Sequence, residues 1–498
     1  MDFFYEYFPV WFMDYLPGWM FVVLFGLLLI GYPVAFTIGA LALLFGFIGE
    51  GFGFFNLLPL RIWGVMQNFT LVAVPLFVFM GVTLERSGLA EELLETMALL
   101  FGRLRGGLSI SVIVVGALLA ASTGIVGATV VTMGLLALPT MIRRNYSPEL
   151  ATGTIAASGT LGQIIPPSIV LVVLAEIMQV SVGDLFVGAI LPGFLLVTLY
   201  LIFIFVNGIV RPHTSPPVPP EELAAISGKE LARRVMFSLV PPLLLMLAVL
   251  GTIFAGVASP TEAAAVGATS AMLLVTPRKY RLLKAAGLGL IFAIMLVKMF
   301  MGVIPWYGLI IYGFFSGLLI FNKHHIGIAD LKGVMRTTVR LTAMVFIILV
   351  GAQAFGLTFR GLGGDDLIRD FLTHLNMSPN GVLIIVMITL FLAGFFLDFI
   401  EIAFIHVPVL TPLMAFYGFD KVWFAVLIAV NLQTSFLTPP FGYALFYLKS
   451  VCPPSVTTAH IYRGIVPFVI LQLFGLFLVA LFPELVLWLP SVVFSGVK

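Results

Sequence analysis

The sequence predicts an all-α polytopic membrane protein made of two inverted copies of one unit, each with a re-entrant hairpin and a broken helix. Three observations lead to this fold class. First, 61% of the 498 residues are hydrophobic and only 10% are charged, whereas a soluble domain carries about 25% charged residues. Second, two Pro-Pro pairs interrupt apolar segments at a constant offset along the chain. Third, lysine and arginine gather on one side of the predicted layout.

The first Pro-Pro pair lies in the apolar segment Thr160–Val170. Proline lacks a backbone donor and clashes with the preceding turn, so Pro166 and Pro167 must break any helix that runs through them. In hydrocarbon, backbone groups freed by such a break are tolerated only where they face protein or a water-filled cavity. A broken helix at membrane depth therefore offers carbonyls and amides to a ligand.

The second pair, Pro439-Pro440, lies in a similar apolar segment near the C-terminus. Pro440 follows Pro167 by 273 residues, and Pro412 follows Pro139 by the same number. The same offset relates two further pairs, Met141 with Met414 and Gly88 with Gly361. These coincidences predict that the chain contains two copies of one unit.

In the first copy, Met20–Gly49 and Arg61–Leu84 are expected to span the membrane. The charged stretch Glu85–Arg105 has amphipathic spacing, which suits a helix lying along the interface. Gly107–Met141 is apolar except for a polar centre at Ala121–Gly127. One straight span would leave that centre in lipid and exceed the roughly 20 residues that a bilayer needs. We therefore expect two half-spans that turn at this tip, which is a re-entrant hairpin.

The rest of the chain repeats this order with additions. A proline-rich linker, Arg211–Arg234, separates the copies. The second hairpin is expected at Gly381–Tyr417, with its tip at Gly394–Glu401. A helix pair within Leu288–Phe321 has no counterpart in the first copy. The remaining expected spans are Leu185–Val210, Val235–Ala255, Gly256–Val275, Thr337–Phe359 and Gly464–Trp488.

The distribution of basic residues orients this layout. Most lysines and arginines fall on one side, among them Arg143, Arg144, Arg233 and Arg234, and the positive-inside rule makes that side cytoplasmic. The N-terminus is then inside and the C-terminus outside. The first hairpin enters from the cytoplasm and the second from outside, as in many secondary transporters with inverted repeats.

Several function classes lack support. The net charge of +2 comes with no basic face that could hold nucleic acid. The single cysteine, Cys452, excludes an intramolecular disulfide framework and a multi-cysteine metal site. A membrane-embedded enzyme is one alternative to a transporter, but the sequence has neither His-Glu-x-x-His nor Gly-x-Ser-x-Gly. A channel is another, but paired opposed hairpins suit alternating access better than an open pore. No Walker A motif is present, so ATP is not expected to drive this chain directly.

Six short segments resemble the large membrane subunit of the TRAP (tripartite ATP-independent periplasmic) transporters. They are Ser158–Gly162, Ile165–Ser168, Ser259–Ala265, Phe396–Asp398 and Val430–Leu432 with Thr438–Pro440. The resemblance implies sodium-coupled uptake of an organic acid across the bacterial or archaeal cytoplasmic membrane, with no cofactor besides sodium as coupling ion. It also implies an elevator fold, a small four-helix membrane subunit and a periplasmic solute-binding protein as partners. A stand-alone ion-coupled symporter of the same architecture is the alternative.

The elevator implied by this resemblance divides the chain into four parts. Scaffold segments are expected at 1–106 and 211–377, and transport segments at 107–210 and 378–498. One departure concerns the first hairpin, where the family usually carries Ser-Gly-Ser and this chain has Ser122-Thr123-Gly124.

Sodium is a hard cation that takes oxygen ligands, and each copy places a hairpin tip beside a broken helix where oxygens can converge. The predicted sodium-binding residues are Ser122, Gly124, Ser158, Gly159, Thr160, Asp398, Asn431, Gln433 and Thr438. Half-helix N-termini carry a positive partial charge that suits a carboxylate. The predicted substrate-binding residues are Thr123, Pro166, Pro167, Ser168, Pro439 and Pro440.

Other readings stay open for several polar residues. Glycine, serine and threonine also let helices pack closely, without any ligand. Glu401 is at the second tip and could face outside water, and Glu262 is expected to cap a helix start. His406 is expected to be a packed histidine rather than a ligand.

Overall fold

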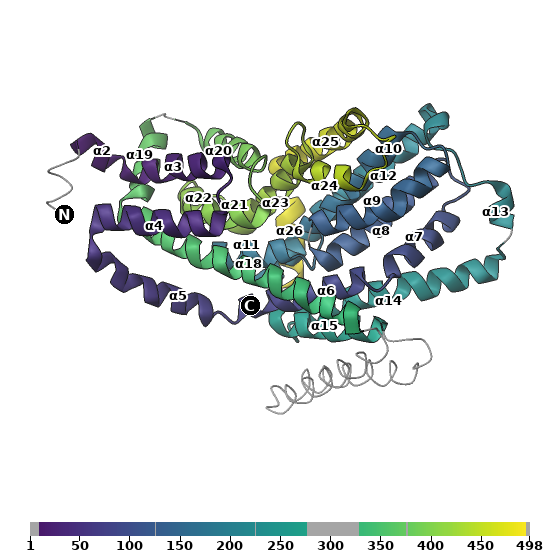
Figure 1. Ribbon diagram of the computed structural model, residues 1–498, viewed down its shortest axis with the longest axis horizontal. Helices are drawn as coiled ribbons and strands as arrows, with labels where there is room; N and C mark the ends of the chain where they lie inside the picture. Colours follow the sequence, from purple (N-terminus) through teal and green to yellow (C-terminus); the bar gives the residue numbers. More distant parts are fainter. Residues whose placement is uncertain (1–8, 125, 225, 276–327, 375–376, 495–498) are drawn as a thin grey trace, which may run out of the picture.

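The computed structural model describes residues 9–124, 126–224, 226–275, 328–374 and 377–494, and within these ranges every regular element is helical. The helix pair expected within 288–321 lies outside the described residues. Figure 1 shows α8, α9 and α10 toward one end of the molecule, α3, α4 and α20–α22 toward the other, and α23 between them. These and the other elements are defined by residue range in the paragraphs below.

Three helices of the first copy, α3, α4 and α8, end at a glycine. Two predicted spans differ from the structure and are described below. The helices are α2 Val10–Asp14, α3 Leu16–Ile30, α4 Val34–Glu50, α5 Leu58–Met66, α6 Ala73–Glu85, α7 Leu89–Leu100, α8 Gly107–Thr123, α9 Val126–Arg143, α10 Pro148–Thr160, α11 Ile169–Met178 and α12 Val182–Val210, with short 3₁₀ turns η1 Phe52–Leu57, η2 Thr70–Val72 and η3 Leu161–Gln163.

The prediction of a single span over Met20–Gly49 is wrong, because two helices, α3 and α4, occupy this stretch. Gly31 has φ of 96°, a left-handed conformation that ends α3, and Pro33 then cannot donate to a continuing helix. The second predicted span is also divided. Its two parts, Phe52–Met66 and Thr70–Glu85, meet at an angle of 55°.

The second copy begins after the linker and follows the predicted order, except that the last predicted span, Gly464–Trp488, is divided into two helices at Phe482-Pro483. The linker contains η4 Pro212–Thr214 and α13 Pro220–Ala224. The helices of the second copy are α14 Gly228–Phe254, α15 Pro260–Val275, α18 Ile328–Gly361, α19 Gly364–His374, α20 Pro379–Ala393, α21 Phe399–Ile405, α22 Val407–Phe416, α23 Lys421–Leu437, α24 Tyr443–Val451, α25 Thr458–Leu481 and α26 Glu484–Val493.

The 273-residue offset holds at the level of whole helices. α9 starts at Val126 and α21 at Phe399, while α10 starts at Pro148 and α23 at Lys421. Both pairs are separated by the predicted offset. The copies differ in the second arm of the hairpin, which is the single helix α9 in the first copy. In the second copy this arm is divided into α21 and α22, which meet at 55° beside His406.

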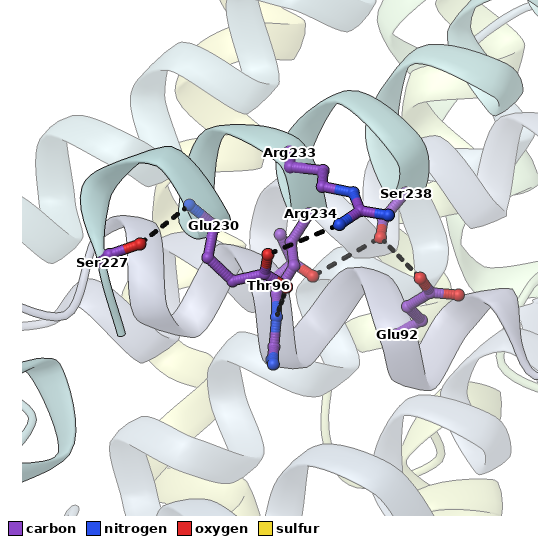
Figure 2. Close-up of polar contacts among 7 residues, drawn as sticks. All are labelled: Glu92, Thr96, Ser227, Glu230, Arg233, Arg234 and Ser238. Carbon is purple, nitrogen blue, oxygen red and sulfur yellow. Dashed lines mark hydrogen bonds and ion pairs between the residues drawn. The ribbon is translucent and has the colours of Figure 1, made fainter. Parts of the chain in front are cut away.

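The observed linker is shorter than the predicted one, Arg211–Arg234, because α14 begins at Gly228. The Ser227 side chain caps this helix by accepting from the Glu230 backbone N–H. Arg233 and Arg234 then lie on the helix and pair with Glu230, as Figure 2 shows. A serine N-cap followed by an acidic residue in the first turn favours a helix that starts here. The prolines near the start of the linker gave no indication of this helix start.

The predicted amphipathic segment forms α7, which packs between α8 and α14. Its apolar face is buried, while its contact with α14 includes polar groups. The Ser238 hydroxyl on α14 donates to Glu92 at 3.1 Å and lies 3.5 Å from Thr96, both on α7 (Figure 2). α7 is therefore fixed against the start of the second copy.

The two broken helices form the centre of the core. α10 is buried from Leu150 to its end, and α23 is buried from Trp423 to its end. Around this core, within the described ranges, five helices are long and apolar enough to cross a membrane, or up to seven if each of two bent pairs counts as one span.

Candidate ion and substrate site at the hairpin tips

The first hairpin turns at Gly124, which has φ of 61° and ends α8. A Cβ atom at Gly124 would lie 3.1 Å from the backbone nitrogen of Ile169, the residue that opens α11 after the first Pro-Pro pair. A Cβ at Gly162 would come within 2.4 Å of the Ala120 carbonyl oxygen on α8. The tip of the hairpin therefore lies directly against the break in the helix, as predicted.

Three buried hydroxyls surround the first break. Ser158 Oγ donates to the Ile155 carbonyl at 3.0 Å, and Thr160 Oγ1 donates to the Ala157 carbonyl at 2.9 Å. Ser168 Oγ donates to the Gln163 carbonyl at 2.9 Å. Each proton is thus directed at the backbone, which leaves the oxygen lone pairs to accept or to coordinate. The same bonds also satisfy the hydrogen-bonding capacity of these hydroxyls in a packed core, so the arrangement is equally compatible with a purely structural role.

The second break is built in the same way from α23 and α24. Asn431 Nδ2 donates to the Met387 carbonyl at 2.8 Å, and Ser435 Oγ donates to the Phe391 carbonyl at 2.5 Å. These donors are one helical turn apart on α23, and so are their acceptors on α20. Two side chains therefore hold the first arm of the second hairpin against the broken helix.

Thr438, at the end of α23, resembles the first-copy hydroxyls, since its Oγ1 donates to the Thr434 carbonyl at 2.8 Å. The peptide bond between Pro439 and Pro440 is cis, as is the one between Pro166 and Pro167. Tyr462 on α25 donates to the Pro440 carbonyl at 2.8 Å.

The tip of the second hairpin carries two carboxylates. Asp398 is the N-cap of α21 and forms a capping box with Glu401. In that box Glu401 Oε2 accepts from the Asp398 backbone N–H at 3.0 Å. The side chain of Tyr443, at the start of α24, lies within electrostatic reach of both carboxylates. Asp398 therefore starts a helix, and it also lies beside the second break.

Aromatic rings connect this tip to the second break. The Phe396 ring lies 5.1 Å from that of Phe441, and the Phe395 ring lies 6.1 Å from it, measured between centroids. The corresponding contact in the first copy is made by Gly124 and Ile169. The two tips thus use different chemistry for the same contact.

The two copies meet beyond these contacts. α24, which follows the second break, packs against α9, which follows the first tip. A Cβ at Gly127 would come within 2.8 Å of the Tyr447 ring, and the Tyr447 hydroxyl donates to that of Tyr443 at 3.2 Å. A chain of contacts therefore runs from the first tip to the second.

The structure brings most of the predicted residues together, with two exceptions. The side chains of Ser122 and Thr123 are outside the described part of the first tip, so only the helix end there is defined. Gln433 is fully buried away from α20, beside Tyr200 of α12 and Gln472 of α25. The other predicted positions, Gly159 included, line the two breaks or their tips.

Sequence reasoning missed four residues at this site. Ser435 follows Asn431 by one helical turn, a spacing that could have identified it. Tyr443, Tyr447 and Tyr462 carried no comparable signal, because their roles depend on contacts between helices that are distant in sequence.

Two structural expectations are confirmed. Glu262 caps α15, since its Oε2 accepts from the Ser259 backbone N–H at 2.8 Å. His406 is buried, and its ring lies 5.7 Å from that of Phe25 and 6.2 Å from that of Phe21. Among the described residues, no group of three or more histidine, cysteine, aspartate or glutamate side chains could hold a metal ion.

Comparison with known proteins places this architecture among transporters. The family model described as "Tripartite ATP-independent periplasmic transporter, DctM component" matches residues 21–485. The chain is 28% identical to the C4-dicarboxylate TRAP transporter large permease protein DctM of Pseudomonas aeruginosa, with 87% of this chain and 89% of that protein covered. It is 27% identical to the sialic acid TRAP transporter large permease protein SiaM of Vibrio cholerae, with 95% and 97% covered.

Two further similarities extend the comparison. The ectoine TRAP transporter large permease protein TeaC of Halomonas elongata is 25% identical, with 95% of this chain and 99% of that protein covered. Among solved structures, the YdaH transporter of Alcanivorax borkumensis shares the fold, with a TM-score of 0.54, 15% identity, and 95% and 98% of the two chains covered. These relatives are named as transporters or permeases, which supports transport over the enzyme alternative.

Proposed function

Because the chain belongs to the DctM family of tripartite ATP-independent periplasmic transporters, we propose that it is a permease subunit that carries an organic acid across the cytoplasmic membrane together with sodium. The observation that carries this proposal is the repeated pairing of a hairpin tip with a broken helix. Each pairing gathers oxygen atoms and interrupted helix ends in the centre of the core, around Gly124 in the first copy and Asp398 in the second.

Sodium coupling is supported by the kind of oxygen at the two breaks. Hard cations prefer hydroxyl, carbonyl and carboxylate oxygens. Ser158, Thr160 and Thr438 direct their protons to helix carbonyls, so their lone pairs are available to an ion. Asp398 adds a carboxylate at the second tip. The interrupted helices α11 and α24 begin at these breaks, and their N-termini suit the carboxylate of a substrate.

We further propose an elevator, in which transport segments 107–210 and 378–498 move against scaffold segments 1–106 and 211–377. Several polar contacts cross between these segments, and two of them lie at the end of α6 and in the turn before it. Thr132 Oγ1 on α9 donates to Glu85 at 2.9 Å, and Asn68 donates its amide proton to Glu176 on α11. A sliding motion of the transport segments would break both contacts, so these contacts can form in only one position of the elevator.

The family implies two partners, a small four-helix membrane subunit and a periplasmic solute-binding protein. α7 and α14 form a braced pair that suits a stationary scaffold. In this proposal the small subunit binds the scaffold, and the binding protein docks on the periplasmic face. The N-terminus is then cytoplasmic and the C-terminus periplasmic, in accordance with the positive-inside rule.

Reconstitution into proteoliposomes tests this function. Uptake of a labelled organic acid should require an inward sodium gradient, the small membrane subunit and the binding protein, and it should be negligible for the permease alone. Full sodium-driven uptake by the permease alone would favour the stand-alone symporter. Uptake that ignores the sodium gradient would contradict sodium coupling.

A further inference from the structure

A cluster of three polar side chains lies in the core apart from the two breaks. Tyr200 comes from α12 in the first copy, and Gln433 and Gln472 come from α23 and α25 in the second copy. We call these residues the amide–phenol cluster. All three side chains are 0% exposed, and the three helices contact one another in pairs.

Five polar atoms of this cluster lack a hydrogen-bond partner of regular geometry among the residues that the structure describes. The unpartnered atoms are the Tyr200 hydroxyl and both the Nε2 and Oε1 atoms of Gln433 and Gln472. The Tyr200 hydroxyl lies close enough to both amides for a weak hydrogen-bond interaction, stronger with Gln472 than with Gln433, but neither contact has the distance and angles of a regular hydrogen bond. A buried polar atom without a partner costs about 1–3 kcal/mol, so five of them in one place call for a guest molecule.

The phenol ring of the cluster is held in place by aromatic packing. The Phe468 ring packs edge-on against Tyr200 with centroids 5.2 Å apart, and Phe203 packs against Phe468 at 5.1 Å. Tyr200 therefore keeps its hydroxyl between the two amides.

The donors and acceptors decide the kind of guest. The cluster offers two amide carbonyls and a phenol oxygen as acceptors, and two amide NH₂ groups and one O–H as donors. Sodium would find only three oxygens, where hard cations take about six, and it would leave both NH₂ groups unpartnered. Water both donates and accepts, so it satisfies the carbonyls as well as the NH₂ groups.

We propose that the amide–phenol cluster binds internal water molecules, which bridge α12 of the first copy to α23 and α25 of the second. Buried waters of this kind make about three hydrogen bonds each to groups that otherwise lack partners. The bridge joins the parts of the chain on either side of the linker into one unit. This inference rests on burial and hydrogen bonding alone, so it holds whichever solute is carried.

Apolar substitutions provide the first test. Each of Tyr200→Phe, Gln433→Leu and Gln472→Leu should lower the midpoint of thermal unfolding by a few degrees. Each substitution removes one polar side chain and leaves the bridging water and the remaining side chains with fewer hydrogen bonds. The triple variant should lose less than the sum of the three, because it removes the whole polar set. Tyr32→Phe, at a side chain 57% exposed, is the matched control and should leave the midpoint unchanged.

Two further measurements separate water from the alternatives. A high-resolution cryo-electron microscopy map of the transporter complex should show density between the three side chains, and this density should persist when sodium is replaced by potassium. Density that disappears without sodium would overturn the proposal in favour of a cation. A map of that quality with no density between the three side chains would also overturn it, since the side chains would then bond one another directly.

Discussion

Replacing Gly162 with alanine tests whether the first hairpin and the first break form one site. Gly162 lies in η3, between α10 and the first Pro-Pro pair, where it passes the end of α8. A Cβ at this position would meet three backbone atoms of Ala120, with its oxygen at 2.4 Å. Backbone atoms cannot rotate away as a side chain can, so one of the two segments must move.

The required movement can be estimated from that distance. Ordinary carbon–oxygen contact begins at roughly 3.4 Å, so η3 and α8 must separate by about 1 Å. Functional sites tolerate only about 0.5 Å of displacement. The hydroxyls of Ser158 and Thr160 lie on the turn before η3, and the tip at Gly124 follows Ala120 by one turn. We expect the sodium concentration for half-maximal uptake to rise at least about tenfold, equivalent to about 1.4 kcal/mol.

The assay is a sodium titration of uptake in proteoliposomes that contain both partner proteins. Gly251→Ala is the matched control, because a Cβ there meets nothing within 4 Å, and it should leave the titration unchanged. Size-exclusion chromatography of both variants shows whether they fold. A well-folded Gly162→Ala protein with the sodium titration of the wild type would refute the reasoning that the tip and break form one ion site.

Three further predictions use other contacts. Asp398→Asn keeps a capping oxygen but removes charge, so it should raise the half-maximal sodium concentration about tenfold with little effect on folding; an unchanged titration would exclude a coordinating role. Gly464→Ala places a Cβ 2.0 Å from the Glu149 carbonyl oxygen, where α10 crosses α25, and should lower the free energy of unfolding by about 1–3 kcal/mol, measured by thermal or denaturant unfolding. Tyr146→Phe removes the acceptor for the Leu108 N–H at 3.2 Å and should cost about 1 kcal/mol. Burial raises the pKa of Tyr146 from 10.0 to about 12, so the neutral phenol contributes fully to the free energy of unfolding below pH 10. This contribution is lost as the pH rises toward 12, and the Tyr146→Phe variant should lack this pH dependence.

The parts of the fold that sequence reasoning predicted are those governed by local chemistry. Pro166-Pro167 and Pro439-Pro440 break helices wherever they occur, and the constant offset between them follows from the repeated unit. The predicted boundaries were wrong where one or two residues end or start a helix within a longer stretch of uniform composition. Gly31 with Pro33 divides one predicted span, because a single left-handed residue can reverse the chain without changing its composition. Ser227 starts α14 inside a stretch that its prolines suggested was a linker.

The candidate site shows a different limit of sequence reasoning. Ser158, Asn431 and Thr438 were identified because they flank helix breaks, and flanking is a property of sequence. Gln433 flanks the same break as Asn431, yet the two side chains contact different helices, because residues two apart lie on opposite sides of α23. Which side faces the hairpin is decided by the packing of α20, α12 and α25 around α23. That packing joins residues more than 200 positions apart. Composition and spacing therefore identify the broken helix, while only the assembled core separates the side of α23 that faces the hairpin from the side that carries Gln433.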